Sequence, residues 1–204
     1  MKNKQVLIAF TALIALLAVN CNAQSSGALT GKWFFEDFLY GDELVVVEFT
    51  QNKMTVLLLE DDDTDTYSYR ADSKTITIDD DDEFQYVVQN GNTLIMTDSY
   101  GDKYTGKKVR ANAKTLSGKY EMVNDAGFIE TLDFTDGSTV RGTGDAFGLS
   151  SFKFTAKYKI SGSTVTISES TGGYGIIVLE IIGESILKGN TLGGFGDDSV
   201  FIKR

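Results

Sequence analysis

The run TYSYRADSKTITI at residues 66–78 decides the fold, because the chain contains it twice. It aligns without gaps on TAKYKISGSTVTI at residues 155–167, an offset of 89 residues. In the first copy the apolar Tyr67 and Tyr69 stand on either side of Ser68. Alternation with a period of two is typical of a half-buried β-strand. The run therefore predicts strands, and its recurrence predicts that a whole structural unit is duplicated.

The duplication extends on both sides of this run. Four further pairs of segments match in the same order: residues 29–33 (LTGKW) with 116–120 (LSGKY), 48–50 (EFT) with 133–135 (DFT), 90–94 with 182–186, and 107–108 with 203–204. The offset drifts from 85 to 96 residues, as expected when insertions gather in hairpin loops. We therefore expect two domains, over residues 28–111 and 114–204.

Each unit holds about eight strand-like stretches separated by turn signals, and no convincing amphipathic helix follows residue 23. The dipeptides Asn90-Gly91 and Asp136-Gly137 suit tight hairpins, which need positive φ angles. The chain has no proline, which agrees with continuous hydrogen-bonded strands. This pattern predicts an all-β protein made of two tandem small antiparallel meander β-barrels. The alternative is one larger barrel or sandwich formed jointly by both repeats.

The repeated motif carries a family resemblance. An opening Leu-x-Gly-x-Trp strand, a strand ending in an acidic residue and Phe, and a meander closing on a basic pair resemble the small bacterial lipocalin-like domains. The resemblance implies that Trp33 closes one end of the first barrel under Lys108 or Arg110. It implies the same role for Tyr120 in the second barrel, under Lys203 or Arg204. A stack of a cation on an aromatic ring contributes about 0.5–2 kcal/mol.

The first 23 residues have the composition of an export signal. Lys2 and Lys4 precede an apolar run from Val6 to Val19. A run of this length is too short to span a bilayer, which needs about 20 residues, but it fits the apolar region of a secretory signal.

Two cleavage products are expected from this signal. In one, cleavage after Ala23 leaves a mature chain that starts at Gln24. In the other, Cys21 becomes the lipid-modified N-terminus of a bacterial lipoprotein, although Asn20 departs from the usual small residue before that cysteine. Both predict an exported protein, either secreted or anchored by lipid to an outer or periplasmic surface of the cell envelope.

The composition excludes several kinds of chemistry. The chain has no histidine and one cysteine, so it cannot build a Ser-His-Asp triad, a histidine-ligated zinc site or an internal disulfide. Its formal net charge is −10, which argues against a nucleic-acid partner, because binding phosphates needs a clustered basic surface. We expect no enzymatic activity, no cofactor and no metal site.

Acidic runs at residues 60–65 and 79–83 are the most visible local feature. Clustered carboxylates favour calcium, but neither run has the spacing of an EF-hand loop. The simpler interpretation is a pair of solvated hairpin loops. A weak ion site shared by the two runs stays open.

Three other features invite a functional interpretation, and each has a structural one that we prefer. Glu48, Asp133 and Glu180 are candidate acid–base carboxylates, but a period of two turns the first two outward while Phe49 and Phe134 turn inward. Glycine-rich stretches at residues 142–145, 172–175 and 193–196 lack the helix that a phosphate loop needs. A set of aromatic residues is expected to form either the core or the lining of a small cavity: Tyr67, Tyr69, Phe84, Tyr86 and Tyr100.

The expected function is therefore that of an exported binding or interaction protein of the cell envelope. It would contact an unknown protein or matrix partner through the faces and loops of its barrels. The alternative is a carrier that holds a small apolar ligand inside one or both barrels. No ligand-binding residues are assigned, and Cys21 is the only predicted modification site.

Overall fold

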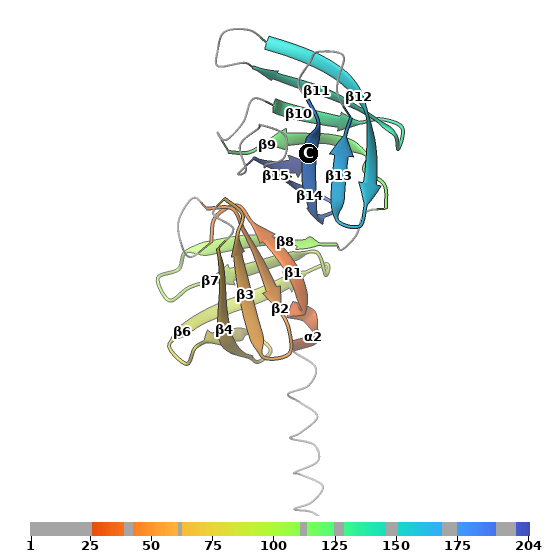
Figure 1. The fold of residues 1–204 in the computed structure, drawn as a ribbon. Coiled ribbons are helices and arrows are strands. Elements are labelled where there is room, and N and C mark those ends of the chain that lie inside the picture. Colours follow the sequence, from red (N-terminus) through yellow and green to blue (C-terminus); the bar gives the residue numbers. More distant parts are fainter. Residues whose placement is uncertain are drawn as a thin grey trace, which may run out of the picture. The chain divides into compact units, whose positions relative to one another are not determined.

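The computed structural model describes residues 26–38, 43–60, 63–110, 114–124, 129–145, 151–168, 175–190 and 199–204. They form two closed antiparallel barrels of eight strands each, in a chain that divides into two compact units (Figure 1). The predicted fold class, an all-β protein of two tandem meander barrels, is confirmed. The alternative of one joint barrel or sandwich is wrong, because each set of eight strands closes on itself.

The first barrel runs up and down in chain order and closes between its first and last strands. A one-turn helix, α2 (Ser26–Leu29), precedes it, where the sequence had predicted no helix. The strands are β1 (Gly31–Phe35), β2 (Val45–Phe49), β3 (Lys53–Leu58), β4 (Thr64–Ala71), β5 (Thr75–Ile78), β6 (Asp82–Gln89), β7 (Thr93–Thr97) and β8 (Lys103–Val109).

The second barrel repeats this order and closes where its last strand pairs with its first. Its strands are β9 (Gly118–Met122), β10 (Ile129–Phe134), β11 (Thr139–Asp145), β12 (Ser151–Ser161), β13 (Thr164–Ile167), β14 (Ile177–Gly183), β15 (Ile186–Asn190) and β16 (Val200–Lys203).

The sequence repeat and the strand register agree. Residues 66–78 cover most of β4 and all of β5, and their copy covers the corresponding parts of β12 and β13. In the first barrel Tyr69 pairs with Ile78, and in the second Tyr158 pairs with Ile167. Each of these residues lies 89 positions after its counterpart, so the two hairpins have the same register.

Aromatic rings fill much of the first barrel. Phe35 stacks on Phe38 with 4.5 Å between ring centres, and the edge of Tyr104 packs 5.4 Å from Phe38. Phe35 also lies against the backbone of Gly106, where an added Cβ would come within 2.5 Å of the ring. Only glycine fits under this ring, so the inside of β8 is packed directly on an aromatic side chain.

The second barrel has an equivalent aromatic core. Phe134 packs edge-on against Tyr158 at 4.9 Å, as Phe49 packs against Tyr69 at 5.2 Å in the first barrel. Tyr120 also packs edge-on with Phe134, with 5.4 Å between ring centres. The Phe–Tyr contact of the repeat thus occurs in both barrels.

The predicted hairpin turns are confirmed at Asn90-Gly91, where both residues have positive φ angles of 51° and 68°. At Asp136-Gly137 only the glycine does, with φ at 73°. Asp136 instead uses its carboxylate to accept hydrogen bonds from the backbone N–H groups of Ser138 and Thr139.

Candidate functional site

The up-and-down topology sorts the loops of the first barrel between two ends. Connections after β1, β3, β5 and β7 meet at one end, and those after β2, β4 and β6 meet at the other, where α2 leads into β1. The two ends differ sharply in charge. We call the end that carries the connections after β1, β5 and β7 the acidic end.

The described loop residues of the acidic end (36–38, 43–44, 79–81 and 98–102) include no lysine or arginine. The connection after β3 is not part of this set, because Leu58–Asp63 group with the second unit. At the opposite end, loop residues 50–52, 72–74 and 90–92 include one carboxylate and one lysine, Asp72 and Lys74. The acidic end presents eight carboxylates: Glu36, Asp37, Glu43, Asp79, Asp80, Asp81, Asp98 and Asp102.

The turn after β5 holds its carboxylates in a fixed conformation. Asp79 and Asp80 have positive φ angles of 45° and 67°, a region that Asp tolerates better than most residues. Asp79 accepts a 2.7 Å hydrogen bond from the backbone N–H of Ser68. Arg70 forms a 2.7 Å ion pair with Asp80 on the exposed surface. The second predicted acidic run is therefore an ordered turn.

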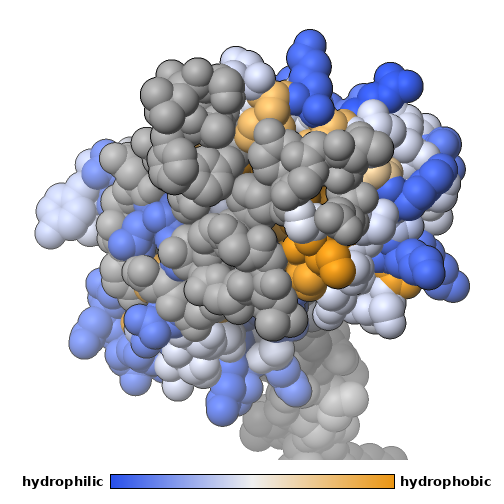
Figure 2. All heavy atoms as spheres, turned by 45° about the horizontal axis from the view of Figure 1, so that its top comes forward, coloured by the Kyte–Doolittle hydropathy of each residue, from blue (hydrophilic) through white to orange (hydrophobic). Residues whose placement is uncertain are grey.

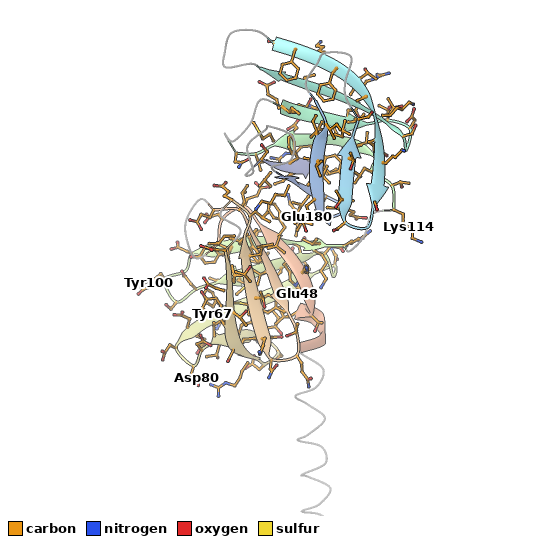
Figure 3. The ribbon with its side chains drawn as sticks, viewed as in Figure 1. Glu48, Tyr67, Asp80, Tyr100, Lys114 and Glu180 are labelled. Atoms are coloured by element: carbon orange, nitrogen blue, oxygen red, sulfur yellow. The ribbon has the colours of Figure 1, made fainter. Side chains whose placement is uncertain are left out.

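The loop after β7 is organised by Asp98. Its Oδ1 accepts hydrogen bonds from the backbone N–H groups of Tyr100 and Asp102, both at 2.9 Å, and its Oδ2 accepts one from the Tyr104 hydroxyl at 3.2 Å. Desolvation raises the pKa of the Asp98 carboxyl, but the hydrogen bonds outweigh it, so the pKa lies below its usual value. The ring of Tyr100 stands out in solvent, 91% exposed (Figure 3).

One further carboxylate of the acidic end is unusual. The Oε2 atom of Glu43 is buried and has no hydrogen-bond partner among the described residues. Buried polar atoms in folded proteins are nearly always paired. Glu43 is thus an exception to this rule within the described part of the acidic end.

The opposite end of the first barrel is closed by Trp33. Its indole N–H donates a 2.7 Å hydrogen bond to the carbonyl of Leu29 in α2. Lys108 Nζ lies 4.2 Å from the centre of the ring, and its partial burial lowers the pKa of this lysine. Of the two cations expected over Trp33, Lys108 holds the position, whereas Arg110 pairs with Glu184 at 3.7 Å.

The second barrel copies this arrangement with one change. Tyr120 is fully buried and donates a 2.6 Å hydrogen bond to the carbonyl of Glu184, and burial together with the Glu184 charge raises its pKa to about 12. In each barrel a lysine lies against the glycine that opens the first strand. A Cβ added at Gly31 would be 3.0 Å from Lys108 Nζ, and a Cβ added at Gly118, where φ is 85°, would be 3.2 Å from Lys203 Cε. Lys203 is therefore the structural counterpart of Lys108, whereas the sequence alignment matches Lys108 with Arg204.

Arg204, the other cation expected over Tyr120, lies 3.7 Å from Glu121 on the surface.

The outer wall of the first barrel is hollowed between β1 and β8. The hollow has a volume of about 310 Å³, and Lys107 Nζ and Glu36 Oε1 in its lining lie 3.9 Å apart. This hollow is on the outside of the barrel, whereas the sequence analysis considered a small cavity inside it. The lining residues are Phe34, Glu36, Asp37, Lys103, Thr105 and Lys107.

The candidate acid–base carboxylates do not converge. Glu48 faces outward and lies 3.7 Å from Lys32, while Phe49 beside it is buried. Asp133 is likewise on the outer wall, in register with Arg141, and Phe134 is buried. Glu180 is exposed on β14 (Figure 3). The predicted inward and outward assignment of Glu48 and Asp133 is confirmed.

The remaining candidates fall into two groups. Gly142 lies under the ring of Phe154, where an added Cβ would be 2.1 Å from a ring carbon, so this stretch serves close packing. The other two glycine-rich stretches lie mostly outside the described residues.

Of the aromatic set, Tyr69, Phe84 and Tyr86 are buried and belong to the core. Tyr100 is exposed, so its expected place in the core or a cavity lining is wrong.

The described part of the chain sets further limits. It contains no group of three or more carboxylate, cysteine or histidine side chains placed to hold a metal ion. None of its helices has the length and hydropathy that a membrane crossing requires. Cys21, the predicted lipidation site, and the whole signal segment of residues 1–23 lie outside the described residues, as do Asp61 and Asp62 of the first acidic run.

Hydrophilic side chains dominate the described surface seen in Figure 2, with small apolar areas between them. Comparison with known proteins finds no matching family model, no matching curated protein and no matching solved structure. The loops of the acidic end thus present carboxylates, with the exposed Tyr100 in the loop that Asp98 organises.

Sequence reasoning identified the acidic run at residues 79–83 but missed Glu36, Asp37, Glu43, Asp98 and Asp102 as its companions at the acidic end. The signal that could have found them is topological. In a meander, alternate loops share an end, so charges must be summed over alternate loops rather than along the chain.

Proposed function

We propose that this protein is an exported, non-enzymatic interaction protein of the cell envelope, and that the acidic end of its first barrel binds a partner with a cationic surface. The observation that carries the proposal is the segregation of charge: eight described carboxylates and no described lysine or arginine in the loops of that end. A surface of one sign attracts an oppositely charged partner and speeds its association.

The loops of the acidic end have features of a preformed contact surface. The Asp79–Asp81 turn is fixed by hydrogen bonding to β4, and Asp98 fixes the loop that carries Tyr100. Ordered loops lose little conformational entropy on binding. Tyrosine is among the residues that contribute most to binding at protein interfaces, and Tyr100 is available for such a contact.

Two further observations favour interaction over catalysis or transport. The candidate acid–base carboxylates Glu48, Asp133 and Glu180 lie apart on outer walls, rather than in a shared cleft. The rings packed inside the first barrel, such as Phe35 on Gly106, occupy space that a carrier of a small apolar ligand would need.

The proposed setting follows from the signal-like residues 1–23. The protein would be secreted, or held at an envelope surface by an acyl chain on Cys21, with a short polar tether before α2. Its two domains would be lipocalin-like, a relation supported by Trp33 under Lys108 at the closed end of the first barrel.

A matched pair of charge variants tests the role of the acidic end. Asp79→Asn, Asp80→Asn and Asp81→Asn together remove three charges, and Asn tolerates the positive φ angles there. The control removes three charges from the outer wall of the second barrel: Glu130→Gln, Asp133→Asn and Glu180→Gln. Binding of a ten-residue oligolysine is measured by calorimetry at low and high salt.

The proposal predicts about tenfold weaker binding for the acidic-end variant, because several weak exposed ion pairs are lost together. The control should bind nearly as the natural protein does. Equal losses in both variants would mean that only net charge matters, and would contradict a role for this end.

A further inference from the structure

We propose that the outer face of β12 in the second barrel binds a linear anionic polysaccharide, with Lys153, Lys157 and Lys159 as its main contacts. This inference goes beyond the function proposed above, because it assigns a second surface and a partner of the opposite charge.

The three lysines form a row along one strand. The side chains of β12 alternate strictly over its central part: Lys153, Thr155, Lys157 and Lys159 are exposed, and the residues between them face the core. At a rise of about 3.3–3.4 Å per residue, Lys153 lies roughly 13 Å from Lys157, and Lys157 roughly 7 Å from Lys159. In Figure 1, β12 is the long pale-blue strand of the second barrel.

The neighbouring strands extend this face mainly with threonines, and Asp145 of β11 pairs with Ser151 at the start of β12, two residues before Lys153. Arg141 of β11 pairs with Thr155, and Thr139 and Thr143 pair with Lys157 and Lys153. On the other side, Thr166 of β13 pairs with Lys159. The face therefore combines four cations with hydroxyl groups, which donate to and accept from sugar hydroxyls and anionic groups.

The cations of this face form no ion pair with the part of the second barrel that the structure describes. Lys157 Nζ donates a 2.7 Å hydrogen bond to the Thr139 hydroxyl. Among the described residues, Lys153, Lys159 and Arg141 form no ion pair. The three lysines of the row are therefore available to an anionic partner, whereas Arg141 lies in register with Asp133 of β10.

The first barrel shows that folding does not require this row. The positions of β4 that correspond to the three lysines are Thr64, Ser68 and Arg70, and the arginine is tied to Asp80. The inward residues of the two strands are alike, with Tyr158 taking the place of Tyr69.

Protection of a sheet edge does not explain the lysines either. Exposed lysines often block the pairing of edge strands, but β12 is paired on both sides within a closed barrel. The row is therefore a property of the outer surface of the second barrel alone.

The shape of the face favours a linear polyanion over other anionic partners. A membrane-bound face needs apolar side chains that insert between lipids, and single-stranded nucleic acid is held by stacking on aromatic rings. The described residues of β11, β12 and β13 include no exposed large apolar or aromatic side chain. A straight row of cations flanked by threonines instead matches an extended chain of acidic sugars.

The test uses the full-length chain and polygalacturonate, a linear polysaccharide with a carboxylate on each sugar, with neutral dextran as a second probe. The row variant combines Lys153→Gln, Lys157→Gln and Lys159→Gln. The matched control combines Lys53→Gln, Lys74→Gln and Lys103→Gln, which removes the same charge from the first barrel. A third variant replaces the three row lysines by arginine, and thermal melting checks that all variants fold.

We expect polygalacturonate to bind the natural chain with an affinity that falls as salt rises, and dextran not to bind. The row variant should bind about tenfold more weakly, because three exposed ion pairs are lost. The first-barrel control should bind within about twofold of the natural chain, and the arginine variant should retain binding.

Several results would overturn the assignment: no binding of polygalacturonate, equal loss in the row and control variants, or binding only to phosphatidylglycerol vesicles or to oligothymidylate. Salt-sensitive self-association that disappears in the row variant, without polygalacturonate binding, would assign the row to a second copy of the chain instead. Each of these results leaves oligolysine binding at the acidic end unchanged, so failure here is distinct from failure of the proposed function.

Discussion

Lys108 Nζ lies 4.2 Å from the ring centre of Trp33, on one face of an indole whose N–H is bonded to the carbonyl of Leu29. This contact joins the last strand of the first barrel to its first strand and to α2. The contact therefore links the two ends of the first domain's chain where the barrel closes, at the end opposite the acidic end.

Replacing Lys108 tests this closure. Lys108→Gln should lower the free energy of unfolding by about 0.5–1 kcal/mol, the range expected for a partly exposed cation on an aromatic ring. Urea unfolding followed by Trp33 fluorescence measures the change. Lys107→Gln is the matched control, because Lys107 faces outward on the same strand. An equal effect at both positions would show that the ring contact adds nothing.

Gly106 tests the packing of the first barrel. Gly106→Ala would place a methyl group 2.5 Å from the Phe35 ring, and overpacking of this kind costs about 1–3 kcal/mol. The double variant with Phe35→Leu should be less sensitive to the added methyl than the single variant is. Gly27→Ala, which has open space around it, is the control. A stable Gly106→Ala protein would indicate unfilled space beside Phe35.

The turn at Asp136 predicts a pH dependence. Hydrogen bonds from Ser138 and Thr139 lower the pKa of the Asp136 carboxyl. A carboxyl with a lowered folded-state pKa stabilises the fold above its unfolded pKa of about 3.9, and this contribution is lost as pH falls through the folded value.

The gap in urea midpoint between the natural chain and Asp136→Asn should therefore be constant above about pH 5 and should close in acid. Asp133→Asn, on the outer wall of β10, is the control variant. A gap that widens as the pH falls would contradict the sign of this effect.

The N-terminus gives a direct test of the proposed setting. Mass spectrometry of the protein isolated from its own membrane and culture fractions should find either an acylated Cys21 or a free Gln24 as the first residue. The acylated form should fractionate with membranes. A chain that keeps residues 1–20 in the cell interior would contradict export.

The interior of both barrels could be predicted from the sequence, because inward positions repeat. Alternation fixes which side chain faces the core, and the match of residues 66–78 with 155–167 fixes the strand order and register of one hairpin in each barrel. The cation over Trp33 was reduced to Lys108 or Arg110 by the family resemblance, not by the alternation. The pattern worked because a closed barrel leaves inward side chains no alternative to the core.

The outer surfaces could not be predicted in the same way. Nothing in the packing constrains Lys153 or Lys157, so the corresponding Thr64 and Ser68 give no guide to them. Tyr100 resembled a core aromatic by its residue type, but its loop is organised by the Asp98 carboxylate, which turns the ring into solvent. Predicting the surface residues that lie together requires the strand topology, because the topology determines which loops meet at one end of the barrel.

The central claim is that each repeat closes its own barrel around its own core. Its most direct test is urea unfolding of residues 24–112 expressed alone, followed by the fluorescence of Trp33, the only tryptophan in the chain. The account predicts blue-shifted native emission and one cooperative transition, close to the one that Trp33 reports in the full chain. Red-shifted emission with a gradual change over all urea concentrations would contradict it.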